Sequence, residues 1–144
     1  MRYVYPVNLI RDEDGQYVVS SADVPEALTE SRTSAEALHA MADALGAALA
    51  GYVLEGREIP EPSPGGPEDR LAPVAPLVAA KLALRAAMRA EGLSNVALAK
   101  RLGVSEGAVR RLIDPDHASR LDRVVNALTA LGRSLAIEDL NQAA

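Results

Sequence analysis

The chain has 144 residues, 49% hydrophobic and 24% charged, which is a globular composition with room for one ordinary domain or two small ones; it has no cysteine, which excludes disulfides and thiol chemistry. No apolar run approaches the length of a membrane span and no signal-peptide pattern is present, so we expect a cytoplasmic protein that does not enter a membrane. The net charge is −5, but residues 1–70 hold 5 basic and 13 acidic residues and residues 71–144 hold 10 and 7, which predicts two parts with different partners.

The N-terminal segment "RYVYPVNLI" predicts a β-strand because its apolar side chains recur at period two. These side chains are Tyr3, Tyr5, Val7 and Leu9. Pro6 inside the segment favours an edge position or a bulge. A turn at "RDEDGQ" leads to a second strand in "QYVVSS", and the loop "DVPEALTES" leads into a possible third strand at residues 27–31.

A long amphipathic helix follows. Thr33 and Glu36 have the spacing of a capping box, in which a hydroxyl and a carboxylate satisfy free N–H groups at a helix start. Apolar side chains then recur every three or four residues at Leu38, Met41, Ala42, Leu45, Leu49 and Tyr52. The helix should end near residues 54–56. One long helix and a small antiparallel sheet make an α+β domain over residues 1–60.

A proline-rich stretch then interrupts the pattern. Six of the nine prolines lie at positions 60, 62, 64, 67, 73 and 76. Proline lacks an N–H donor and restricts its predecessor, so we expect a linker without regular structure over residues 61–73. The remaining residues, 74–144, should form a second, all-α domain.

Capping and stop signals predict four helices in this second domain: one at residues 75–91, one from Ser94 to Gly103, one from Ser105 to Asp114, and one from Ser119 to Gly132. Ser119 and Asp122 again have capping-box spacing. The following segment "SLAIEDL" predicts a short strand, and the alternative is a frayed tail. An unpaired strand could join the same strand of a second chain, so we expect a homodimer or a tetramer with its contact in the C-terminal half.

The second and third of these helices have the pattern of a helix-turn-helix beginning at Asn95. Ala99 lies where two helices would cross closely, Gly103 suits a turn that needs positive φ, and Ser105 caps the following helix. The positions expected to be buried are Leu98, Leu102, Val104, Val109 and Leu112. The alternative is an ordinary helical hairpin with a solvated arginine face.

The exposed side of the second helix matches a DNA-recognition helix. Its N-terminal turn would point into the major groove, and Arg110 or Arg111 could contact guanine or clamp a phosphate. Residues 81–133 hold 10 basic and 5 acidic groups, so the motif lies in the positive part of the chain. The residues expected to bind duplex DNA are Asn95, Lys100, Ser105, Glu106, Gly107, Arg110 and Arg111.

No pattern of residues indicates an enzyme. Metal-dependent phosphodiester cleavage needs carboxylates that converge on cations, and the N-terminal candidates are Asp12, Glu13, Asp14, Asp23 and Glu26. The first three crowd one turn, which favours a solvated acidic turn. His39 and His117 have no potential nucleophile at a sequence spacing typical of a catalytic site. We therefore expect no catalytic residues, no metal site and no cofactor.

The whole chain resembles the HicB antitoxins of bacterial type II toxin–antitoxin pairs. The N-terminal part is similar through "DEDGQYVV", "DVPEALTES", "TSAEALHAMADAL" and "IPEPS", and the C-terminal part through "KLALRAAM" and "LAKRLGVSEGAVRRLIDPDHASRLDRVVNALTALG". Two departures are Ser21-Ala22, where an aromatic residue and proline are usual, and Ser31-Arg32, where a Gly-Asp turn is usual.

The resemblance implies a partial ribonuclease H-like N-terminal domain and the helix-turn-helix branch of the family. It also implies a partner, HicA, which is a small basic ribonuclease that cleaves mRNA, and repression of the protein's own operon through operator DNA. The acidic half would attract such a basic partner. Two alternatives stay open: a stand-alone transcriptional regulator whose N-terminal domain senses a ligand, and a nuclease.

Overall fold

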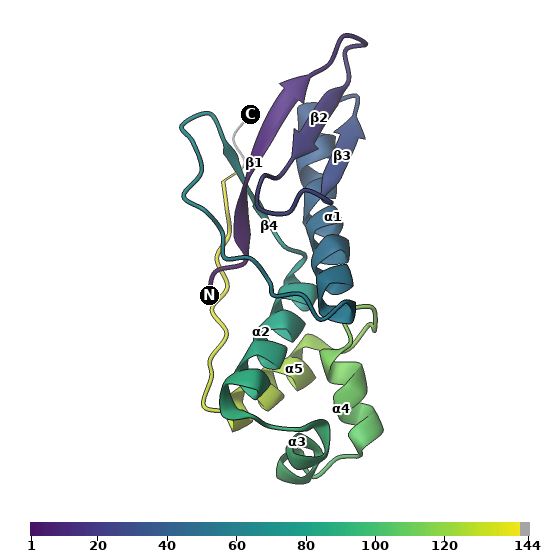
Figure 1. Ribbon diagram of the computed structural model, residues 1–144, viewed down its shortest axis with the longest axis vertical. Coiled ribbons are helices and arrows are strands. Elements are labelled where there is room, and N and C mark those ends of the chain that lie inside the picture. The colour runs from purple at the N-terminus through teal and green to yellow at the C-terminus, as the bar shows by residue number, and fades with distance from the viewer. Residues whose placement is uncertain (142–144) are drawn as a thin grey trace. The chain divides into compact units, whose positions relative to one another are not determined.

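The computed structural model describes residues 1–141 and forms two compact units (Figure 1). Among the described residues, unit 1 is Met1–Ala75 with residues 139–141, and unit 2 is Pro76–Glu138. The strands are β1 (Val4–Arg11), β2 (Tyr17–Ser20), β3 (Leu28–Ser31) and β4 (Arg70–Pro73). The helices are α1 (Ser34–Leu54), α2 (Pro76–Glu91), α3 (Asn95–Leu102), α4 (Glu106–Ile113) and α5 (Leu121–Ala130).

Unit 1 is one antiparallel sheet covered on one face by α1 (Figure 1). The strand order is β3-β2-β1-β4. Strand β1 changes partner along its length, because β2 pairs with Asn8–Arg11 whereas β4 pairs with Val4–Val7. The predicted α+β unit with a small antiparallel sheet and one long helix is therefore present.

Strand β1 lies between β2 and β4, but Pro6 has a strand neighbour on one side only, which agrees locally with the expected edge position. Pro6 pairs with Leu71 of β4, and β2 pairs only with residues 8–11 of β1. Pro6 thus lies in the half of β1 that has no β2 partner. Its missing N–H costs no ladder hydrogen bond on that side.

The expected linker is wrong at its C-terminal end. Residues Arg70–Pro73 form β4, and the boundary between the two units falls after Ala75. Two polar contacts tie the proline-rich residues before β4 to unit 1: the Tyr5 hydroxyl donates to the Pro60 carbonyl at 2.6 Å, and the Ser63 N–H donates to the Asp23 carboxylate at 2.9 Å. These contacts and the free edge of β1 order a stretch that has weak local preferences.

Helix α1 begins and ends where the sequence predicts. The Thr33 hydroxyl accepts from the Glu36 N–H at 3.2 Å. The Glu36 carboxylate does not complete a capping box but accepts from the Ser31 hydroxyl at 2.8 Å. By length and composition alone α1 could cross a membrane, contrary to the sequence-based expectation. It instead packs on the sheet, with Met41, Leu45 and other residues of its apolar stripe fully buried.

Unit 2 is helical, and its core contains no aromatic residue among the described positions. Leu, Val, Ala and Met side chains from α2, α3, α4 and α5 form one cluster. The expected Ser119 capping box is absent: Arg120 occupies the N-cap position of α5 without a side-chain hydrogen bond, and the Ser119 hydroxyl donates instead to the Arg111 carbonyl at 3.2 Å. Residues 134–140 carry no regular element, so the expected strand there is not formed.

Candidate nucleic-acid interface

Helices α3 and α4 are joined by residues 103–105. The Ser94 hydroxyl accepts from the Ala97 N–H at 3.1 Å and so caps α3, and the Ser105 hydroxyl accepts from the Ala108 N–H at 3.1 Å and caps α4. Gly103 ends α3 with φ of +67°, a conformation that costs any other residue type strain. Both caps and the turn residue are as predicted.

The packing of the two helices buries three of the five positions expected to be buried and covers a fourth in part. Leu98 and Val109 are fully buried, Leu112 is buried and Leu102 is half-buried. Val104 is the exception, because 43% of it is exposed. It lies in the turn, outside both helices, and its side chain faces a groove described below.

The seven residues predicted to bind DNA all lie on α3, α4 or the residue that caps α4. Asn95 and Gly107 are half-buried, and the remaining five are exposed: Lys100, Ser105, Glu106, Arg110 and Arg111. A Cβ atom at Gly107 would meet only side-chain atoms, the nearest at 3.6 Å. Packing within the unit therefore does not require glycine there, whereas a close external partner would.

Arg110 and Arg111 lie in the last turn of α4 and make no ion pair within the part of the chain that the structure describes. Arg101, by contrast, pairs with Glu91 at 3.2 Å. The two guanidinium groups of α4 are thus available to an anionic partner, which supports the predicted role of this helix.

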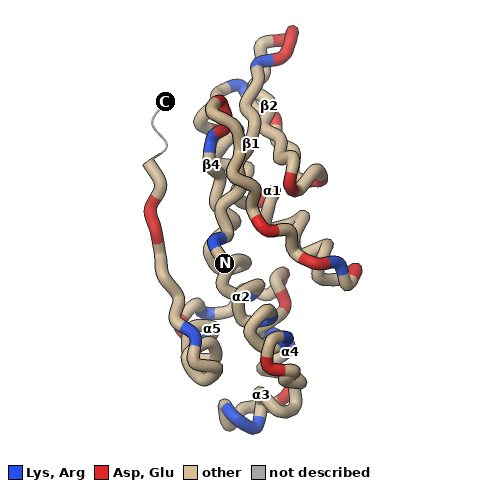
Figure 2. Tube along the Cα trace, turned by 60° about the vertical axis from the view of Figure 1, so that its left-hand side comes forward, with Lys and Arg blue, Asp and Glu red and all other residues tan. Residues whose placement is uncertain are grey.

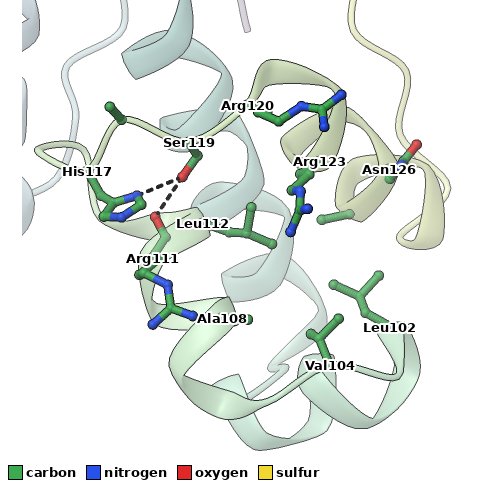
Figure 3. Close-up of a pocket in the computed structure, with 12 residues that line it drawn as sticks. Leu102, Val104, Ala108, Arg111, Leu112, His117, Ser119, Arg120, Arg123 and Asn126 are labelled. Carbon is green, nitrogen blue, oxygen red and sulfur yellow. Dashed lines mark hydrogen bonds between the residues drawn. The ribbon is translucent and has the colours of Figure 1, made fainter.

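A groove beside α4, which the sequence did not reveal, has a volume of about 500 Å³. Its apolar lining includes Leu102, Val104, Ala108, Leu112 and Ala127. Arg111, Arg120 and Arg123 also line it, and the Arg123 guanidinium extends into it (Figure 3). The lining contains no acidic residue. Arg120 and Arg123 were missed because they precede and begin a helix outside the predicted motif, where spacing gives no signal.

Unit 1 presents a different surface. Acidic residues gather at the β1–β2 turn and elsewhere on this unit (red in Figure 2). The strand register places Ile10, Val18 and Leu28 on the sheet face opposite the buried Tyr5 and Val7. Ile10 is 55% exposed and Leu28 is 62% exposed. The face away from α1 therefore combines exposed apolar side chains with nearby acids.

The carboxylates considered for catalysis occupy separate structural positions. Asp12 accepts N–H groups from Asp14 at 3.0 Å and Gln16 at 2.8 Å, which stabilises the β1–β2 turn. Glu26 accepts from the Tyr52 hydroxyl and pairs with Arg57 at 3.0 Å. The Tyr52 hydrogen bond, with help from Arg57, lowers the pKa of Glu26. The arrangement favours a structural role for these acids.

Comparisons with known proteins cover both units. A family profile described as "HicB_like antitoxin of bacterial toxin-antitoxin system" matches residues 4–83. Antitoxin HicB of Escherichia coli is 38% identical over 133 residues, which is 92% of this chain and 96% of that protein. Antitoxin HicB 1 of Photorhabdus laumondii is 37% identical over 92% of this chain and 84% of its own length, and antitoxin HicB of Pseudomonas fluorescens is 36% identical over 89% and 88%.

Proposed function

The chain belongs to the HicB-like family of antitoxins of bacterial toxin–antitoxin systems, a non-enzymatic role, and from this premise we propose that it neutralises a HicA-like, mRNA-cleaving toxin through unit 1 and represses its own operon through unit 2. The observation that carries the proposal is the similarity to relatives named antitoxins over 133 residues, which include parts of both units. Both activities belong in the cytoplasm, where the toxin's substrate and the operator lie.

For toxin binding, we propose the sheet face that bears Ile10, Val18 and Leu28. Exposed apolar side chains of this size are typical of the centre of a protein interface. Residues 1–70 carry a net charge of −8, which speeds encounter with a basic protein and orients it. A partial ribonuclease H-like fold is the form that the family resemblance implies for this unit.

For DNA binding, we propose that α3, the turn and α4 form a helix-turn-helix in which α4 enters the major groove. Arg110 and Arg111 are exposed and without ion pairs in the described chain, so they can meet base edges or phosphates. Arg123 lies on the same groove as Arg111 and extends the positive surface toward a DNA backbone, whereas Arg120 beside it pairs with Asp122 at 2.9 Å. A dimer or tetramer would bring two such helices to two half-sites.

A separation-of-function experiment tests both halves in the full-length chain. Arg110→Ala with Arg111→Ala should weaken binding to a duplex covering the promoter of the operon that encodes the chain, by about 1–3 kcal/mol for each residue that contacts a base. The same variant should still form a complex with the small basic protein encoded beside it and restore growth when that protein is expressed.

The complementary variant, Ile10→Lys with Leu28→Lys, should lose the toxin complex and growth rescue but keep promoter binding. Leu54→Lys is the matched control, because Leu54 is 75% exposed and lies at the end of α1, outside the proposed face. Loss of toxin binding in the control as well would show that added charge, and not the sheet face, is responsible. Wild-type protein that binds neither partner would refute the proposal.

A further inference from the structure

Unit 2 contains a buried lysine that the proposed function does not use. Lys81 lies on α2, and its side chain is fully buried. Its ammonium group donates three hydrogen bonds, each of 2.8 Å, to the Arg111 carbonyl, the Asp114 carbonyl and the Ser119 hydroxyl. Every proton of the ammonium group therefore has a partner.

Burying a charged ammonium group in a small apolar core costs desolvation free energy. Burial disfavours the ammonium form and lowers the pKa of Lys81, and the charge of Asp114 opposes that shift. An apolar side chain of similar length would fill the same volume without this desolvation cost. What an apolar side chain could not do is bind the three oxygen atoms.

Two of those oxygen atoms, the Arg111 and Asp114 carbonyls, lie at the C-terminal end of α4. This helix has eight residues, ends at Asp114 in an extended conformation, and has no glycine at that end to close its last carbonyls. Lys81 supplies donors to two of them. Arg110 and Arg111, the proposed DNA-contacting residues, lie in the turn that these contacts hold.

Ser119 extends the network to the loop after α4. Its hydroxyl accepts from Lys81 and donates to the Arg111 carbonyl at 3.2 Å, and it lies 3.1 Å from Nδ1 of His117 (Figure 3). The Ser119 hydroxyl therefore has Lys81, Arg111 and His117 within hydrogen-bond distance. The hydroxyl that sequence spacing suggests as a cap of α5 thus joins the loop to α4.

We propose that Lys81 is a positioning residue for DNA recognition: through the carbonyls of α4 and the Ser119 hydroxyl it fixes the last turn of α4 and the loop that leads to Arg120. Lys81 itself does not touch DNA. This inference rests on the proposed DNA-binding function. It adds that the direction of the arginine side chains depends on a residue buried in another helix.

The test compares full-length variants in two measurements, promoter affinity and hydrogen exchange of the peptide that covers α4. Lys81→Met keeps the side-chain length and removes the three donors. Arg89→Met is its matched control, because it removes the same charge from an exposed position of the same helix. Ser119→Ala removes the hydroxyl, and Ser119→Thr keeps it.

We expect Lys81→Met to weaken promoter binding by about tenfold or more, the size of one disturbed base contact, and to speed exchange in α4. Ser119→Ala should give a smaller loss in the same direction. Arg89→Met and Ser119→Thr should exchange like wild type in α4, and all four variants should still bind the toxin. If Lys81 only stabilised the fold, variants with wild-type helical circular dichroism and melting temperature would bind the promoter with wild-type affinity.

Two results would overturn the inference: wild-type promoter affinity in Lys81→Met, or a loss of affinity without faster exchange in α4. If Lys81→Met does not fold, the Ser119 pair decides, and equal affinities of Ser119→Ala and Ser119→Thr refute it. Failure of the proposed function is recognised separately, because wild-type protein would then not bind the promoter duplex at all.

Discussion

Two segments without regular structure, one in each unit, are held by a side chain from a distant part of the chain. In unit 1 the proline-rich residues 57–69 are tied by the Tyr5 hydroxyl to the Pro60 carbonyl, and in unit 2 residues 114–120 are tied by the Lys81 ammonium. The Tyr5–Pro60 contact is one neutral hydrogen bond, supported by a second from the Ser63 N–H to the Asp23 carboxylate, whereas Lys81 sets one charged group against three acceptors.

The difference reflects what else stabilises each unit. In unit 1 the segment continues into β4, whose backbone hydrogen bonds to β1 fix its path. Unit 2 has no sheet among the described residues, so no backbone ladder is available to the loop after α4. Side-chain donors from the core must then satisfy the backbone carbonyls. The loop after α4 therefore relies on one buried polar side chain, Lys81, where the proline-rich segment has strand pairing as well as side-chain contacts.

The largest expected loss of stability comes from truncating core side chains, and it tests whether the two units unfold independently. Leu45→Ala in unit 1 and Leu98→Ala in unit 2 each truncate a fully buried side chain and should cost about 2–5 kcal/mol. All four tyrosines lie in unit 1 and the chain has no tryptophan, so tyrosine fluorescence reports that unit. Leu98→Ala should shift the helical circular dichroism transition in urea and leave the fluorescence transition in place. Coincident shifts of both signals in both variants would show one cooperative unit.

Two glycines give a matched pair for backbone strain. Gly103 has φ of +67° with open space around it, so Gly103→Ala should cost about 1–2 kcal/mol, the price of left-handed backbone. Gly65 has φ of +73°, and a Cβ there would lie 2.7 Å from the Pro6 Cβ. Gly65→Ala should therefore cost more, and in unit 1 only. Equal losses measured by chemical denaturation would mean that the proline-rich segment moves aside.

Alkaline pH should act on the two units with opposite sign. Burial raises the pKa of Tyr3, Tyr5 and Tyr52, so the unfolded chain releases their protons first and unit 1 loses stability above pH 10. Between its unfolded and its folded pKa, a tyrosine contributes at most about 1.4 kcal/mol per pH unit. Burial lowers the pKa of Lys81, so unit 2 gains stability as pH rises toward 10.5.

Chemical unfolding is followed between pH 8 and 11 by tyrosine absorbance, which reports unit 1, and by helical circular dichroism, which reports both units. The circular dichroism transition that has no counterpart in the tyrosine signal then gives the slope of unit 2. Tyr5→Phe should make the unit 1 slope shallower, and Lys81→Met should remove the gain in unit 2. Slopes of the same sign in both units would contradict the assignment of these groups.

The smallest expected effect concerns an exposed cluster in unit 1. Hydrogen bonding to Tyr52 and Arg57 lowers the pKa of Glu26, so its contribution to stability is complete above pH 4.5 and is lost as pH falls toward the lowered value. Glu26→Gln should make the melting temperature fall less steeply as the pH is lowered below 4.5. Arg57→Met should do so partly, and an unchanged curve in both would rule out a stabilising role for the cluster.

Local signals in the sequence predicted the elements well. Thr33, Ser94 and Ser105 cap helices as expected, and Gly103 adopts positive φ, because each of these preferences arises within a few residues of chain. Period-two alternation located β1, and the turn and loop signals that follow it located β2 and β3. The seven residues predicted to contact DNA lie on α3, on α4 and at the residue that caps α4. Their positions could be predicted because the helix boundaries follow from local caps and helical periodicity.

Only the tertiary structure decided the rest. Strand β4 forms in a proline-rich segment because β1 offers an unpaired edge, and nothing in the local residues announces that partner. Val104 is exposed although its position in the motif predicts burial. Lys81 reads locally as one basic residue of a helix, and its role depends on carbonyls 30 and 33 positions away. Hydrogen bonds and desolvation depend on which groups are close together in the folded chain, and the spacing of residues in the sequence does not specify those long-range contacts.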